Sequence, residues 1–122
     1  MIDYNNRFFR AVKNSDNGET SSETIFHYKQ KDSILTADYK GGKIISGHLI
    51  GIIKEDGVID MRYHQINLDG KIMTGECVSR PEILPNGNVR LHEEWRWTSG
   101  DLSSGKSIIE EFKPYYESND FT

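Results

Sequence analysis

Three observations predict an all-β fold for this chain, an eight-stranded antiparallel up-and-down meander that closes into a small barrel. Apolar and polar residues alternate in eight short runs between residues 7 and 112. Gly-bearing turns separate most of these runs, and no stretch repeats apolar residues at helical spacing. Short strands at a regular spacing of about 8–12 residues are typical of a β-sandwich or β-barrel.

The first two expected strands are joined by a polar loop. Residues 7–13 (RFFRAVK) form the first strand, and residues 14–22 (NSDNGETSS) form a loop without apolar anchors. Residues 23–30 form the second strand, which turns at Lys31-Asp32. That dipeptide is the weakest of the hairpin signals in the chain.

The next four strands end at strong hairpin signals. They are expected over residues 34–39, 43–53, 58–67 and 71–80, and they turn at Gly41-Gly42, Asp56-Gly57, Asp69-Gly70 and Asn86-Gly87, the last strand extending through Pro81 and Pro85. Gly-Gly, Asp-Gly and Asn-Gly predict two-residue hairpin loops, because both central residues of such a loop need a positive φ.

The last two strands are expected over residues 89–98 and 106–112, with TSGDLSSG between them as the longest hairpin loop. This loop does not determine the register of the last strand. Pro114 ends the β-ladder, so residues 113–122 are expected to form a tail that is either flexible or packed outside through Tyr115 and Tyr116. The whole chain, residues 1–122, is expected to form one β-barrel domain.

Composition excludes several classes of partner. The 122 residues suit one domain, and the net charge of −4 with 15 scattered Lys and Arg residues argues against nucleic acid. No N-terminal apolar signal region and no run long enough to span a bilayer are present. We therefore expect a cytoplasmic protein without a membrane partner; the oligomeric state stays open.

Two-residue turns would pair Glu76 with Trp97, Val78 with Trp95, Tyr63 with Glu76 and His48 with Gln65. These pairings place a mostly aromatic and aliphatic set on one face: Phe26, Tyr28, Leu35, Ala37, Tyr39, Ile44, Ile50, Ile52, Met61, Tyr63, Val78, Leu91, Trp95 and Trp97. The opposite face is mainly charged and holds His27, Lys29, Asp38, Asp60, Arg62, His64, Arg90, His92, Glu94 and Arg96, together with Gly47, Gly51, Gly75 and Cys77.

The apolar face is expected to point inward, since its exposure would favour aggregation. Eight strands with one buried face can close on themselves and so remove their edges. A barrel of eight strands is just wide enough to be packed solid or to hold one small ligand, and lipocalin- and streptavidin-like barrels share this strand count. A two-layer sandwich remains the alternative, because the sequence does not show closure.

Polar residues on the predicted inner face indicate a ligand pocket. Ligand sites are mostly apolar cavities with a few convergent polar groups. The candidate ligand-binding residues are Tyr28, His48, Tyr63, Gln65, Thr74, Glu76, Trp95 and Trp97. The alternative is that these polar side chains satisfy one another or lie at a solvated rim.

Catalytic candidates come from the same predicted register. If Glu93 faces Glu110 beside Arg80, the two carboxylates cannot both ionise cheaply, and such pairs can serve acid–base chemistry. Glu76 with His48 is a second candidate pair. The alternative for the first group is an ion cluster that closes the barrel mouth. The four histidines lack metal-ligand spacing, so no metal and no cofactor are expected.

Three segments carry a family resemblance: FHYKQ at 26–30, DMRYHQ at 60–65 and GECVSRPEILPNGNVRLHEEWRWTSG at 75–100. They resemble a family of small bacterial proteins often labelled N-acetylglutamate synthase, over roughly residues 5–111. That label implies an enzyme acting on a small acyl or amino-acid-like substrate. Acetyltransferases of that kind cradle the coenzyme A pyrophosphate in a Gln/Arg-x-x-Gly-x-Gly/Ala loop that opens a helix, and this chain contains no such loop.

The sequence thus favours a barrel that binds a small, partly apolar molecule inside and that is not an enzyme. Two alternatives are an enzyme of the kind that the resemblance implies, and a filled barrel with a structural or interaction role.

Overall fold

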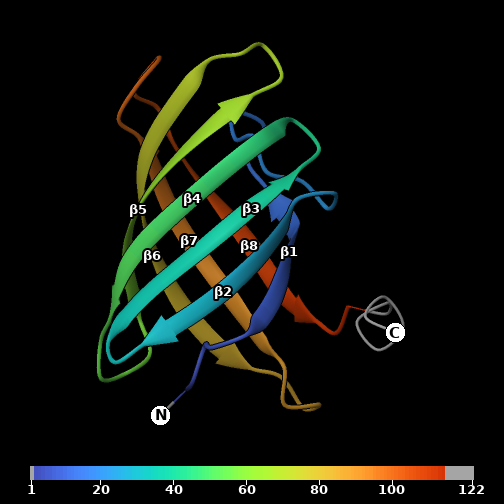
Figure 1. Ribbon diagram of the computed structural model, residues 1–122, viewed down its shortest axis with the longest axis vertical. Coiled ribbons are helices and arrows are strands. Elements are labelled where there is room, and N and C mark those ends of the chain that lie inside the picture. The colour runs from blue at the N-terminus through green and yellow to red at the C-terminus, as the bar shows by residue number, and fades with distance from the viewer. Residues whose placement is uncertain (1, 115–122) are drawn as a thin grey trace.

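Eight antiparallel strands close into a barrel in the computed structural model, which describes residues 2–114 (Figure 1). Each strand pairs with the next, and β1 pairs with β8, so the barrel is complete. This closure confirms the predicted meander and rules out the open two-layer alternative. The strands are β1 (Arg7–Asn14), β2 (Ile25–Lys31), β3 (Ile34–Gly41), β4 (Ile44–Ile53), β5 (Ile59–Asn67), β6 (Ile72–Ile83), β7 (Val89–Trp97) and β8 (Ser104–Phe112).

The hairpin between β6 and β7 differs from the predicted two-residue loop. Gly87 donates its N–H to the Leu84 carbonyl at 2.9 Å, and Leu84 donates to the Asn88 carbonyl at 2.8 Å. This is a three-residue loop with a bulge, in which only Gly87 needs a positive φ, here 87°. Asn86 has no positive φ, so the mirror-image turn expected from Asn-Gly does not form.

The β4–β5 and β5–β6 hairpins repeat the same geometry at Gly57 and Gly70. Each of the three loops is therefore one residue longer than expected, and the register shifts by one. Tyr63 pairs with Gly75 instead of Glu76, and Glu76 pairs with Arg96 instead of Trp97. A shift of one residue turns a strand over, because side chains alternate between faces.

Two strands, β4 and β6, consequently present the face opposite to the predicted one. Ile50 and Ile52 are 58% and 61% exposed, and Val78 is only half-buried. Gly47, Gly51, Gly75 and Cys77, which were expected outside, are buried in the interior. The predicted faces of β5 and β7 are correct, and the two one-residue shifts on either side of β6 keep these strands in phase with each other.

One end of the barrel is closed by a dense aromatic and aliphatic core. Tyr4 is fully buried there and donates its hydroxyl to the Gly57 carbonyl at 2.7 Å. Burial raises the pKa of Tyr4 to about 12. The fully buried residues around it include Phe9, Tyr28, Leu35, Ile59, Val89, Leu91 and Ile109. We call this the closed end.

Glu111 also stabilises the closed end. Its Oε1 accepts a hydrogen bond from the Val89 backbone N–H at 2.9 Å and one from Arg7 Nη1 at 2.8 Å. Its side chain is 4% exposed, so this is a largely buried carboxylate with a charged partner.

The expectation for the tail beyond Pro114 falls outside the described residues. Across residues 2–114, the structure has no helix long and apolar enough to cross a membrane.

Candidate functional site

The opposite end of the barrel, which we call the open end, is crossed by the loop of residues 15–24 between β1 and β2. Hydrogen bonds hold this loop over the barrel mouth: Asn14 Nδ2 donates to Thr20 Oγ1 at 2.9 Å, and Asn17 Nδ2 donates to Ser103 Oγ at 2.9 Å. This segment, predicted to lack apolar anchors, is anchored by polar side chains.

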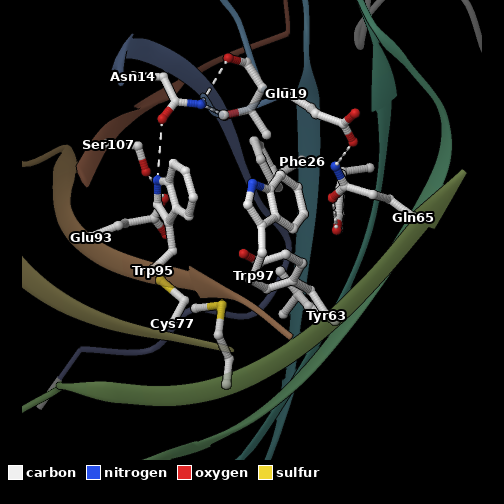
Figure 2. Close-up of a pocket in the computed structure, with 15 residues that line it drawn as sticks. Asn14, Glu19, Phe26, Tyr63, Gln65, Cys77, Glu93, Trp95, Trp97 and Ser107 are labelled. Atoms are coloured by element: carbon white, nitrogen blue, oxygen red, sulfur yellow. Dashed lines mark hydrogen bonds between the residues drawn. The ribbon is translucent and has the colours of Figure 1, made fainter. Parts of the chain in front are cut away.

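A pocket lies beneath this loop, inside the barrel (Figure 2). The cavity volume accessible to water is about 50 Å³. This is enough for a few water molecules, at roughly 10–15 Å³ each. The barrel interior is therefore neither a wide channel nor completely filled. The lining residues are Asn14, Gly18, Glu19, Thr20, Phe26, Tyr39, Leu49, Met61, Tyr63, Gln65, Cys77, Glu93, Trp95, Trp97 and Ser107.

Three aromatic rings of the pocket each lie over a glycine on the neighbouring strand. Tyr39 pairs with Gly47, Tyr63 with Gly75, and Trp95 with Gly105. A Cβ built at these glycines would approach the rings to 2.3, 2.2 and 2.4 Å. Glycine is required there because any larger residue would push the ring toward the cavity. The glycines thus determine where the aromatic wall stands.

The two tryptophans are held at both the indole nitrogen and the ring. Trp95 Nε1 donates to Asn14 Oδ1 at 3.2 Å, and Trp97 Nε1 donates to the Asn17 carbonyl at 3.0 Å. Their rings meet edge to face with centroids 5.5 Å apart, and Tyr63 meets Trp97 at 5.9 Å. Such tilted pairs are the favoured aromatic geometry, so the wall is rigid and tied to the covering loop.

A hydrogen-bonded chain runs from the barrel wall to the loop. Tyr39 Oη donates to Gln65 Oε1 at 2.7 Å, and Gln65 Nε2 donates to Glu19 Oε1 at 2.8 Å. Asn67 Nδ2 donates to the other Glu19 oxygen, also at 2.8 Å. Glu19 is thereby fixed over β5, with its carboxylate at the pocket (Figure 2).

Glu93 provides a second carboxylate inside the barrel. Its two oxygens accept hydrogen bonds from Ser79 Oγ at 2.8 Å and Ser107 Oγ at 2.9 Å. Desolvation raises the pKa of Glu93 above its ordinary value, although the two serine hydroxyls act in the opposite direction. Burial, reinforced by Glu93, raises the pKa of the Cys77 thiol well above its ordinary value. Cys77 is therefore a thiol and a poor nucleophile.

The structure brings together four of the eight predicted ligand-binding residues: Tyr63, Gln65, Trp95 and Trp97 all line the pocket. Tyr28 does not line it. This residue is fully buried toward the closed end, against Phe9 at a ring-centroid distance of 4.6 Å, and its hydroxyl finds no hydrogen-bond partner among the described residues.

The other three predicted ligand-binding residues lie on the outer surface, because β4 and β6 are turned over. His48 Nδ1 pairs with Asp38 at 2.6 Å, Thr74 Oγ1 bonds to Thr98 Oγ1 at 2.8 Å, and Glu76 pairs with Arg96 at 2.8 Å. The predicted catalytic pair of Glu76 and His48 therefore does not exist. Among residues 2–114, no group of three or more His, Cys, Asp or Glu side chains is placed to hold a metal ion.

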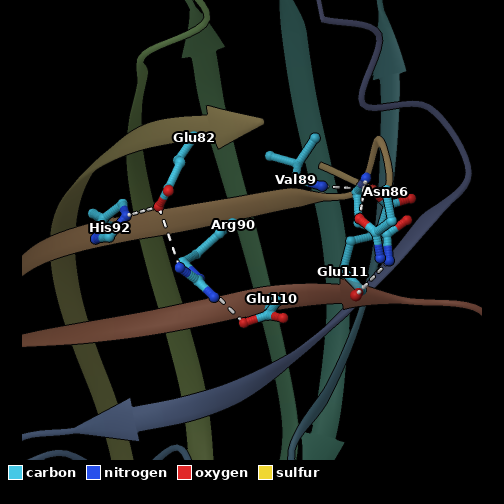
Figure 3. Close-up of polar contacts among 8 residues, drawn as sticks. Glu82, Asn86, Val89, Arg90, His92, Glu110 and Glu111 are labelled. Atoms are coloured by element: carbon cyan, nitrogen blue, oxygen red, sulfur yellow. Dashed lines mark hydrogen bonds and ion pairs between the residues drawn. The ribbon is translucent and has the colours of Figure 1, made fainter. Parts of the chain in front are cut away.

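The predicted cluster of Arg80, Glu93 and Glu110 is also wrong. Glu93 faces Ser107, because β8 pairs three residues away from the assumed register. Glu110 lies outside and accepts from Arg90 Nε at 3.2 Å, while Arg90 and His92 share Glu82 (Figure 3). Arg80 is exposed. The outer pairs are a solvated surface network of small energetic consequence.

Sequence reasoning missed five polar or thiol residues of the pocket: Asn14, Glu19, Thr20, Cys77 and Ser107. Cys77 and Ser107 were hidden by the register shifts in β6 and β8. The other three belong to β1 or its following loop. The length of that loop was the available signal, because the predicted connection over residues 14–22 is already long enough to fold over the mouth of a barrel.

A family model described as avidin-like protein matches residues 2–112 of this chain. The chain belongs to the avidin-like family. This membership agrees with the closed eight-stranded meander, and the avidin-like barrel with its buried aromatic cluster fits a small-molecule-binding barrel. No curated protein matches the chain significantly. Nothing in the avidin-like match supports the N-acetylglutamate synthase activity implied by the resemblance.

Proposed function

We propose that this avidin-like barrel binds a small, partly apolar molecule in the pocket beneath the β1–β2 loop. The observation that carries the proposal is the combination of a rigid aromatic wall with polar groups of Gln65, Glu19 and Glu93 in one cavity. An apolar cavity with a few fixed polar groups is the usual composition of a small-molecule site. The limited free space favours a compact ligand, or a compact group of a larger one.

The geometry favours binding over catalysis. The Cys77 thiol is kept protonated by burial, and the Glu93 carboxylate bonds to two serine hydroxyls rather than to a base or a second acid. Neither arrangement supplies an activated nucleophile. The enzyme alternative therefore lacks a supporting constellation among residues 2–114.

The tryptophans offer a direct test. The chain contains only two tryptophans, and both line the pocket, so its intrinsic tryptophan fluorescence reports on this cavity alone. We expect a bound ligand to change this emission saturably and to raise the melting temperature. Biotin is a reasonable first probe because avidin-like proteins bind small ligands such as biotin, followed by a library of compact aromatic and aliphatic molecules.

A matched pair of Phe→Leu variants controls for indirect effects while keeping both tryptophans. Phe26 lines the pocket, whereas Phe8 stacks on His27 outside the barrel at a centroid distance of 4.2 Å. Phe26→Leu should weaken binding of any ligand found, and Phe8→Leu should leave it unchanged. Equal effects of the two variants, or no fluorescence response to any compound, would contradict the proposal.

A further inference from the structure

Among residues 2–114, the charged side chains that line the pocket are all acidic. Its described lining includes two carboxylates, Glu19 and Glu93, and no Lys, Arg or His. Each carboxylate is held by two neutral donors: Gln65 and Asn67 for Glu19, Ser79 and Ser107 for Glu93. These donors fix the carboxylates in position without neutralising them.

Both carboxylates retain hydrogen-bonding capacity. An ionised carboxylate offers about four lone-pair sites, and protein side chains use two of them at each residue. Negative charge also raises the pKa of the Tyr39 and Tyr63 hydroxyls, after burial as the main cause. A group that carries positive charge and donates hydrogen bonds would satisfy what the pocket leaves open.

The walls suit such a group as well. Phe26 and Tyr39 stack at a centroid distance of 4.8 Å on one side, and Trp95, Trp97 and Tyr63 form the tilted cluster on the other. Aromatic faces attract cations through their quadrupole, most strongly for tryptophan and more strongly when water is excluded. Leu49 and Met61 complete the lining with apolar surface.

From this arrangement we propose that the ligand is an organic cation, a compact ammonium group on a partly apolar body. The ammonium binds between Glu93 and the tryptophan rings, and the apolar body contacts Phe26, Leu49 and Met61. This inference rests on the proposed binding function and specifies the class of ligand. A neutral ligand rich in hydrogen-bond donors is the competing possibility.

Three probes of nearly equal size separate these possibilities: benzylamine, benzyl alcohol and benzoate, titrated at pH 7 with tryptophan fluorescence as the readout. We expect benzylamine to bind at least tenfold more tightly than benzyl alcohol, and benzoate not to bind. Equal binding of the amine and the alcohol, or preference for benzoate, would overturn the charge assignment while leaving the binding function intact. No response to any of the three overturns the charge assignment, and the proposed function is then judged by the wider library.

Variants on one strand make the test specific. Glu93→Gln keeps the shape of the side chain and should reduce benzylamine affinity at least tenfold without affecting benzyl alcohol. Glu94→Gln is the matched control, because the adjacent residue on β7 is exposed on the outer face; it should change neither affinity. If Glu93→Gln does not fold, Glu19→Gln tests the second carboxylate and should also weaken benzylamine selectively. If Glu93→Gln and Glu94→Gln lowered the benzylamine affinity equally, the effect would be due to the net charge of the protein, and the proposal would be contradicted.

Discussion

At the scale of single residues, the barrel interior contains polar groups in two different situations. Some have a specific partner, such as Tyr4, whose hydroxyl donates to Gly57, and Glu111, which has the counter-charge of Arg7. Others lack one: among residues 2–114, Tyr28 Oη has no hydrogen-bond partner, and no Lys, Arg or His lines the pocket beside Glu93. The polar groups with a partner stabilise the closed end. The polar groups without one indicate either a cost to stability or a ligand-binding site.

Glu93 should make the protein less stable at neutral pH than at mildly acidic pH. Its folded-state pKa is raised by desolvation, so its contribution to stability is full below the unfolded-state value near 4.5 and is lost as pH rises through the folded-state pKa. The titratable groups around it inside the barrel are Cys77, Tyr28, Tyr39, Tyr63 and Glu19, and none of them supplies a positive charge. Glu93 also borders a groove whose charged or titratable lining residues are Lys13, Arg80, His92, Glu94 and Lys106.

We therefore expect Glu93→Gln to raise the melting temperature at pH 7 and to reduce the decline in stability between about pH 4.5 and neutrality. Thermal unfolding of the wild type and the variant across this range measures both effects. If the variant and the wild type lost the same stability between pH 4.5 and pH 7, Glu93 would not be the source of the pH dependence.

Tyr4→Phe and Tyr28→Phe should have different costs, although the chemical change is the same. Removal of the Tyr4 hydroxyl leaves the buried Gly57 carbonyl without its donor and should cost about 1–2 kcal/mol. Removal of the Tyr28 hydroxyl eliminates an unsatisfied group and should be neutral or stabilising. Denaturant unfolding of both variants gives the comparison, and equal destabilisation would show that Tyr28 Oη does have a partner.

At the scale of strands, glycine–aromatic pairs across neighbouring strands shape the pocket. Gly75 on β6 lies under the ring of Tyr63 on β5, and the corresponding pairs on β3–β4 and β7–β8 repeat this arrangement. Each ring occupies the volume that a side chain at the paired glycine would need. A substitution at one of these glycines should therefore displace the ring and the cavity wall that it forms.

Gly75→Ala should destabilise the fold by about 1–3 kcal/mol, a typical cost of overpacking, and should weaken ligand binding by moving the Tyr63 ring. The new Cβ would lie 2.2 Å from that ring. In a Tyr63→Leu background the same change should cost much less, and a double-mutant cycle measures this coupling. Additive effects would mean that the ring is not the obstacle.

Arg80→Ala should cost less than about 1 kcal/mol, since β6 presents Arg80 to solvent rather than to a buried cluster. The measurement is denaturant unfolding at neutral pH, with Glu111→Ala as the comparison. Loss of the buried Glu111 carboxylate, which pairs with Arg7 and the Val89 N–H, should cost several-fold more. A large loss for Arg80→Ala would favour an interior role.

At the scale of the whole molecule, the barrel divides into a packed closed end and a pocket under an anchored loop. The fully buried residues Tyr4, Phe9 and Tyr28 are near the closed end, while Asn14, Asn17 and Glu19 tie the loop to the open end. The closed end therefore contains the densely packed core, and the open end contains the candidate ligand pocket.

The purified protein should not convert glutamate and acetyl-coenzyme A to N-acetylglutamate. The sequence has no pyrophosphate-binding loop, and residues 2–114 form no helix to present one. An assay of acetyl-coenzyme A consumption with glutamate, against a protein-free control, checks this. Turnover that disappears in Phe26→Leu but persists in Phe8→Leu would contradict the prediction and place an activity in the pocket.

The number, order and approximate bounds of the strands, and the faces of β5 and β7, follow from the amino-acid sequence alone. These features depend on local alternation and on turn residues, which are properties of neighbouring residues. The aromatic members of the pocket, Tyr63, Trp95 and Trp97, were predictable for the same reason.

The register of the strands, and therefore the composition of the pocket, depends on tertiary packing. Asp-Gly and Asn-Gly are compatible with a two-residue mirror-image turn and with a three-residue loop whose glycine forms a bulge. The difference of one residue turns β4 and β6 over, which removes His48, Thr74 and Glu76 from the interior and places Gly75 and Cys77 there. The choice depends on packing across the barrel, where glycines accommodate the rings of Tyr39 and Tyr63, and no local signal contains that information.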